Sequence, residues 1–146
     1  MHSKCSWDEV VRIVQALLHL SQCLVALHSS GFVHRDVKPG AVLWLPGEHR
    51  WVLVNFCRAA RIGASTPAPC SLSYAAPEVA ANASCAADGG VHAGATPMPA
   101  SIAADMWSLG VVALELFSRA RALDVHGNGV EMVCTDSVFE SACTCV

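Results

Sequence analysis

The chain contains little charge and few aromatic side chains. Charged residues make up 14% of its 146 residues and aromatic residues 6%, whereas hydrophobic residues make up 53%. This composition excludes an intrinsically disordered chain, because disordered segments are poor in apolar residues and rich in charge. A chain of this length can bury a single core. Because so few charges remain to keep a monomer soluble, we expect a protein partner.

The chain also lacks a basic excess and an uninterrupted apolar run. Its formal net charge is −3, so we expect no binding to nucleic acid, which requires a surplus of Lys and Arg. The two most apolar stretches are broken by polar residues, and neither predicts a membrane span. These interruptions are Arg12, Gln15, His19 and Gln22 in one stretch, and Asp105 and Glu115 in the other.

No targeting signal or metal-binding cysteine pattern is evident. Asp8, Glu9 and Arg12 come too early for a signal peptide, so the cytoplasm is the default expectation for localisation. There are eight cysteines but no Cys-x-x-Cys pair, and the pair in residues 143–145 has no partner at zinc-site spacing. We therefore predict reduced thiols and no metal bound to sulfur.

Two apolar segments have helical spacing. Residues 6–30 predict a long amphipathic helix, with Ser6 and Glu9 as a capping box and Gly31 as its stop. Residues 101–117 predict a second helix capped by Ser101. The inner side of this second helix is expected to carry Ile102, Met106, Leu109, Val112, Ala113 and Leu116.

Shorter elements lie between and after these helices. Two β-rich runs, 41–45 and 51–56, predict a hairpin, and a short helix is expected over 78–81. Residues 58–73 predict a loop, 82–100 a flexible insertion and 122–146 an irregular tail. The predicted fold is mainly α with a short β-hairpin, in one incomplete domain at residues 1–121.

The candidate catalytic residues lie in the run from His34 to Pro39, between the first predicted helix and the predicted hairpin. The carboxylate of Asp36 can accept the proton of a substrate hydroxyl, and Lys38 can neutralise phosphate charge. For such a short motif taken alone, the alternative is a solvated turn of mixed charge.

Three segments together resemble the protein kinase family. Residues 26–39 are similar to the end of its long C-terminal-lobe helix and its catalytic loop, 74–78 (Tyr-Ala-Ala-Pro-Glu) to the end of its activation segment, and 105–110 (Asp-Met-Trp-Ser-Leu-Gly) to the start of a buried helix. The order and spacing of these three segments also match those of the family. The resemblance implies the C-terminal lobe of the protein kinase-like α+β fold, and Lys38, two places after Asp36, resembles Ser/Thr kinases.

The resemblance implies a role for each matched residue. Asp36 would be the catalytic base and Lys38 would steady the transferred phosphoryl group, unless both are retained only for the hydrogen bonds of the loop. Leu43 would lie under the adenine of ATP.

The resemblance also implies four structural residues. His34 and Phe56 would belong to a hydrophobic spine, and Asp105 would anchor the backbone of the loop. Glu78 is expected to be solvated, because the arginine that pairs with it late in the family's domain is expected to be missing.

Arg35 could pair with a phosphate on the activation segment. The candidate hydroxyls are Ser65, Thr66, Ser71 and Ser73. Ordinary polar loop residues are the favoured alternative for these four positions.

Three positions depart from the family pattern. The magnesium-binding Asn of the catalytic loop is replaced by Ala41, and the Asp-Phe-Gly motif reads Asn55-Phe56-Cys57. A methyl group cannot ligate a metal, and a neutral amide is a poorer magnesium ligand than a carboxylate. The glycine-rich loop, strand lysine and partner glutamate of the family have no counterpart in these residues.

These departures favour a catalytically impaired module, a pseudokinase that acts by binding another protein. The alternative is a fragment of an active ATP-dependent Ser/Thr kinase, for which alone we expect ATP and magnesium as cofactors. A third hypothesis is a non-functional gene remnant.

Overall fold

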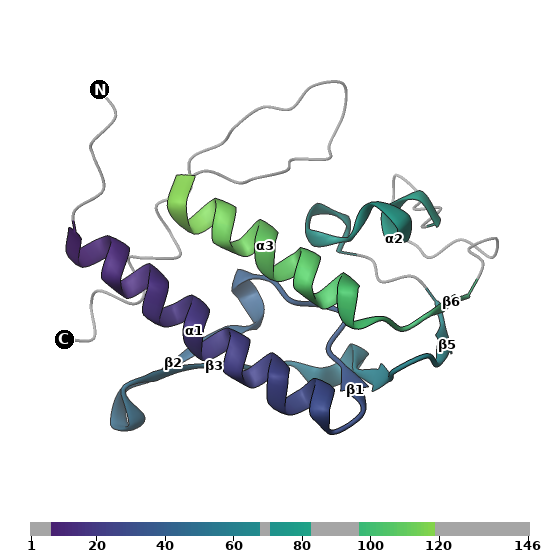
Figure 1. The fold of residues 1–146 in the computed structure, drawn as a ribbon, viewed down its shortest axis with the longest axis horizontal. Helices are drawn as coiled ribbons and strands as arrows, with labels where there is room; N and C mark the ends of the chain where they lie inside the picture. The colour runs from purple at the N-terminus through teal and green to yellow at the C-terminus, as the bar shows by residue number, and fades with distance from the viewer. Residues whose placement is uncertain (1–6, 68–70, 83–96, 119–146) are drawn as a thin grey trace.

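The computed structural model describes residues 7–67, 71–82 and 97–118 (Figure 1). Within them lie three α-helices and six short strands, with 3-10 turns between several of them. In chain order the elements are α1 (Trp7–Ser29), β1 (Phe32–Val33), β2 (Val42–Leu45), β3 (Arg50–Leu53), β4 (Ala60–Arg61), β5 (Ser65–Thr66), α2 (Pro77–Asn82), β6 (Met98–Pro99) and α3 (Ile102–Ser118).

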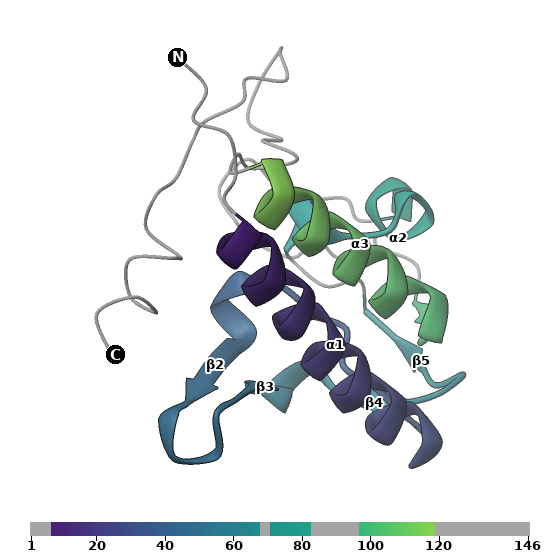
Figure 2. The same cartoon turned by 60° about the vertical axis from the view of Figure 1, so that its left-hand side comes forward.

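The two long helices lie side by side, and the β2–β3 hairpin packs against α1 (Figures 1 and 2). A core cluster joins these elements to the loop between β1 and β2. Its buried members are Leu20 and Leu24 from α1, Val37 and Ala41 from the loop region, Leu53 from β3 and Leu109 from α3. The loop that carries His34 to Pro39 is therefore packed into the core and does not lie only on the surface.

The predicted first helix is confirmed as α1, with its stop at Gly31. Gly31 has φ of 83°, a left-handed conformation that glycine adopts without a Cβ penalty, and its N–H donates to His28 O at 2.9 Å. Ser6 of the predicted capping box lies outside the described residues. By length and composition α1 could also cross a membrane, although core helices meet the same criterion and Leu20 and Leu24 belong to this core.

The predicted hairpin is confirmed as the antiparallel pair β2–β3, in which Trp44 lies opposite Trp51. Its second strand ends at Leu53 rather than at residue 56, because the backbone turns into the left-handed region at Asn55 (φ 67°). The N–H of Trp51 donates to His19 Nδ1 at 3.2 Å, which ties the hairpin to α1.

Two further strand pairs correct the predicted loop at 58–73. β1 pairs with β4, and β5 pairs with β6, both antiparallel. The predicted insertion at 82–100 is structured at its ends, since Asn82 closes α2 and Met98–Pro99 forms β6, while residues 83–96 lie outside the described part. Because each pair joins segments far apart in the chain, no local pattern could predict it.

The second long helix and its cap are confirmed, but its buried face is rotated from the prediction. The N–H of Ala104 donates to Ser101 Oγ at 3.3 Å. Leu109 and Val112 are buried as expected, whereas Ile102 and Met106 are 40% and 50% exposed. Their expected places are taken by Asp105, Ser108 and Val111. Apolar spacing could not show this, because two of these three side chains are polar and are buried through hydrogen bonds.

The short helix predicted at 78–81 is confirmed as α2. The predicted tail at 122–146 lies outside the described residues.

Candidate functional site

Asp105, at the start of α3, holds the backbone of the loop between β1 and β2. Its side chain is buried, with 1% exposed. Oδ2 accepts from His34 N–H at 2.7 Å and Oδ1 from Arg35 N–H at 2.8 Å. His28 Nε2, at the end of α1, donates to Oδ2 at 2.9 Å. One carboxylate therefore fixes two consecutive peptide groups of the loop and links both long helices to it.

His34 is fully buried and its two ring nitrogens have different partners. Nε2 lies 3.0 Å from Val54 O, which can only accept, so this nitrogen carries the proton. Nδ1 then accepts from Asp36 N–H at 3.3 Å. The ring also meets Phe56 edge-on, with centroids 5.1 Å apart. The sequence predicted this pair of residues as neighbours, although Phe56 remains half exposed.

Arg35 has a left-handed backbone (φ 67°). Its guanidinium donates to Arg58 O at 3.3 Å and to Pro67 O, so it joins the loop to the segment that follows β3. Burial lowers the pKa of Arg35, the charge of Arg58 lowers it further, and Asp105 acts in the opposite direction. The positive charge of Arg35 therefore lies near that of the Arg58 guanidinium.

Asp36 and Lys38 form the polar centre of the site. Lys38 Nζ lies 2.9 Å from Asp36 Oδ2 and donates to Ser71 Oγ at 3.1 Å. Arg58 Nε lies 3.7 Å from the same Oδ2. The other oxygen, Oδ1, is buried and has no hydrogen-bond partner. The carboxylate is thus held through one oxygen by two cations while the other remains an available acceptor, which suits a donor such as a hydroxyl.

The two positions expected to hold magnesium in the family lie next to each other. Val54 N–H donates to Ala41 O at 2.8 Å, which brings Ala41 beside the residue that precedes Asn55. Ala41 is fully buried, and Asn55 is exposed in a left-handed conformation. Ala41 offers only a methyl group and Asn55 a neutral amide, so this pair of side chains does not fit a magnesium ion, which prefers carboxylate oxygen.

The remaining predicted residues are exposed. Leu43, expected under adenine, is 49% exposed on β2. Glu78 on α2 is exposed, as expected for a carboxylate kept in solvent, and Cys57 is a free, exposed thiol.

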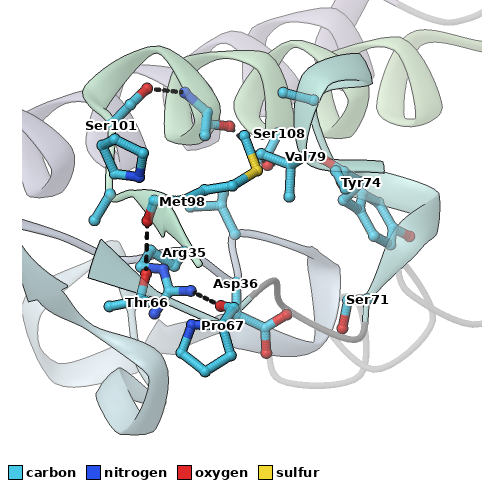
Figure 3. Close-up of a pocket in the computed structure, with 16 residues that line it drawn as sticks. Arg35, Asp36, Thr66, Pro67, Ser71, Tyr74, Val79, Met98, Ser101 and Ser108 are labelled. Carbon is cyan, nitrogen blue, oxygen red and sulfur yellow. Dashed lines mark hydrogen bonds between the residues drawn. The ribbon is translucent and has the colours of Figure 1, made fainter. Parts of the chain in front are cut away.

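A small pocket opens beside Asp36, on the side of Thr66, Pro67 and Tyr74 (Figure 3). Its volume is about 40 Å³, far below the roughly 300–1,000 Å³ of pockets that enclose drug-sized ligands. In Figure 3 the Arg35 side chain reaches the carbonyl of Pro67, and the Thr66 hydroxyl donates to Met98 O at 3.4 Å. The pocket can accept a small group beside Asp36, and no nucleotide fits inside it.

Several residues of the site were not found from the sequence. The sequence places Arg58 in a predicted loop and His28 in a predicted helix. Ser108 Oγ donates to Tyr74 O at 2.7 Å, and Tyr74 OH donates to Glu115 Oε2 at 2.9 Å, so α3 also holds the segment around Tyr74. No pattern signalled these roles, because each partner lies more than 20 residues away in the chain.

Comparisons with known proteins agree with this fold. The protein kinase domain model matches residues 3–141. The serine/threonine-protein kinase Kist of Homo sapiens and that of Mus musculus are each 30% identical over 118 residues, which is 80% of this chain and 26% of the relative. A solved rhoptry kinase from Toxoplasma gondii has a TM-score of 0.56 and 27% identity, over 75% of this chain and 30% of that one.

The chain belongs to the protein kinase family, and its fold corresponds to part of that domain. It is similar to serine/threonine-protein kinases. It spans about a quarter of the length of the curated relatives that it matches.

Proposed function

We propose that this Ser/Thr-kinase-like lobe is a pseudokinase that transfers phosphate poorly or not at all and acts by binding another protein. The observation that supports the proposal is the pair Ala41 and Asn55, which by the resemblance occupy the positions where the family holds magnesium. Phosphoryl transfer depends on cations that neutralise the developing charge on the phosphate oxygens. Loss of one such transition-state contact typically costs about 10²–10³ in rate.

Exposed apolar side chains support the protein-binding part of this proposal. On α1, Trp7 is 84% and Val25 64% exposed, and on α3, Leu114 is 58% exposed. We propose that these side chains belong to the surface that a partner covers, since exposed apolar surface on a soluble protein often marks an interaction site. The low proportion of charged residues also supports a protein partner, because few charges remain to keep a monomer soluble.

The second candidate is a piece of an active ATP-dependent Ser/Thr kinase. It is favoured by the intact Asp36–Lys38 pair at 2.9 Å and by the unbonded Oδ1 of Asp36, which could accept a substrate hydroxyl. In this case ATP and magnesium would be the cofactors, despite the poor donor set at Ala41 and Asn55.

Phosphotransfer by the full chain separates the two candidates. The chain is incubated with radiolabelled ATP, magnesium and a degenerate serine/threonine peptide library, in parallel with Asp36→Ala. We expect equal, background incorporation for both proteins. Incorporation by the wild type that Asp36→Ala abolishes would overturn the pseudokinase proposal and establish the enzyme.

A gain-of-ligand variant tests the observation itself. Asn55→Asp restores a carboxylate at an exposed position, where the substitution should not disturb the core. We expect magnesium, added with ATP, to raise the melting temperature of this variant more than that of the wild type. An equal magnesium effect on both proteins would show that Asn55 does not limit metal binding.

A further inference from the structure

The site lacks a fitting set of metal ligands but contains a cation of its own. The 3-10 turn Phe56–Arg58 begins directly after Asn55, so the turn next to the missing magnesium ligand ends in a guanidinium. Its Nε lies 3.7 Å from Asp36 Oδ2. The Arg58 side chain is 34% exposed, so a solvent-borne ligand can reach it while it stays beside the buried carboxylate.

The local charge balance is positive. Lys38 and Arg58 both face one oxygen of Asp36, so two cations meet one carboxylate. The neutral Asn55 adds no negative charge. Arg35 lies close by, because it donates a hydrogen bond to Arg58 O. Burial is the main cause that lowers the pKa of Arg35, and the charge of Arg58 lowers this pKa further. An anion placed beside Arg58 would relieve the repulsion between these guanidinium groups.

We propose that Arg58 takes over the charge role of the metal, so that the site binds a polyphosphate group without a divalent cation. The inference rests on the proposed loss of the magnesium site and names the ligand class of that same site. A guanidinium suits this task because its planar donors match phosphate oxygens and it stays charged at any ordinary pH. Lys38, 29% exposed, supplies the second positive charge.

Inorganic tripolyphosphate is the appropriate probe because it carries the phosphates of a nucleotide and no adenine. It is titrated into the full chain by calorimetry at constant ionic strength, once with EDTA and once with magnesium. We expect binding in EDTA that magnesium does not tighten. Arg58→Gln should weaken this binding by about tenfold, the loss expected for one charge-assisted hydrogen bond.

Two further variants serve as controls. Arg61→Gln removes the same charge from the exposed guanidinium on β4, which lies over the Phe32 ring, and should change affinity less than about twofold. Arg58→Lys keeps the charge and should retain most of the binding. Thermal melts of each variant show whether the fold is intact.

The proposal is overturned if the wild type binds tripolyphosphate only with magnesium, if it does not bind at all, or if Arg58→Gln and Arg61→Gln lose equal affinity. These outcomes are separate from those of the phosphotransfer assay. Activity that depends on Asp36 would overturn the pseudokinase proposal, whereas a requirement for magnesium in tripolyphosphate binding would overturn the role of Arg58.

Discussion

At the scale of single residues, buried carboxylates with different partners organise the site. Asp105 is satisfied by two backbone N–H groups and His28, whereas Asp36 shares one oxygen between Lys38 and Arg58 and leaves the other unbonded. A buried acceptor without a partner is costly unless a ligand or water meets it. Asp105 therefore has the contacts of a structural residue, whereas Asp36 has one buried oxygen without a partner.

Replacing Asp105 should be among the most damaging single changes in the chain. Asp105→Ala removes the acceptor of His34 N–H and Arg35 N–H, and each unsatisfied donor costs roughly 1–3 kcal/mol. We expect a loss of about 2–6 kcal/mol in the free energy of unfolding, measured by urea denaturation. Glu48→Ala is the control, because its side chain is 62% exposed and 4.0 Å from Arg50, and it should cost less than about 1 kcal/mol. Similar losses for both variants would contradict the anchoring role of Asp105.

At the scale of the elements, α1 is apolar on more than one side, and packing decides which side is inside. Ile13, Ala16, Leu20 and Leu24 are buried, yet the equally apolar Val25 is 64% exposed. The buried side faces β3 and α3, the two elements with which α1 makes most of its contacts. The hydrophobic pattern predicted the helix, but its orientation follows from these neighbours.

Adjacent residues on α1 provide a matched test of this orientation. Leu24→Ala creates a cavity in the core cluster and should cost about 2–5 kcal/mol. Val25→Ala removes a largely exposed side chain and should change stability by less than about 0.5 kcal/mol. Both free energies come from urea unfolding followed by circular dichroism. A large loss for Val25→Ala would mean that its exposed face is covered in solution.

At the scale of the whole molecule, the catalytic-loop region, the hairpin and the long helices share one core. Val37 and Ala41 from that region pack with Leu53 of the hairpin and with Leu109 of α3. The Trp51–His19 hydrogen bond adds a polar link between hairpin and α1. A shared core makes the stability of the site inseparable from that of the fold.

This shared core predicts a single cooperative unfolding transition. In a variant that carries Trp7→Phe and Trp107→Phe, fluorescence comes only from Trp44 and Trp51 of the hairpin. It should report the same urea midpoint as circular dichroism, which follows α1 and α3. Separate midpoints would show that the hairpin unfolds independently. Absence of any cooperative transition would instead favour the gene-remnant hypothesis.

Much of the fold could be predicted because its signals are local. The spacing of apolar residues over 6–30 and 101–117 predicted both long helices, and turn residues predicted the hairpin. The strand pairs β1–β4 and β5–β6 escaped prediction because each joins segments distant in the chain. The buried face of α3 was partly mispredicted, because Asp105 and Ser108 are polar residues buried by hydrogen bonds made elsewhere.

The sequence by itself determined the family, since the motifs at 26–39, 74–78 and 105–110 are contiguous and their chemistry is readable residue by residue. It also predicted, from the resemblance to that family, that Ala41 and Asn55 replace the metal ligands. Only the tertiary structure decided that Arg58 lies beside Asp36 and that Lys38 reaches Ser71. Those approaches depend on distances between side chains that are many residues apart, which folding sets and linear order does not.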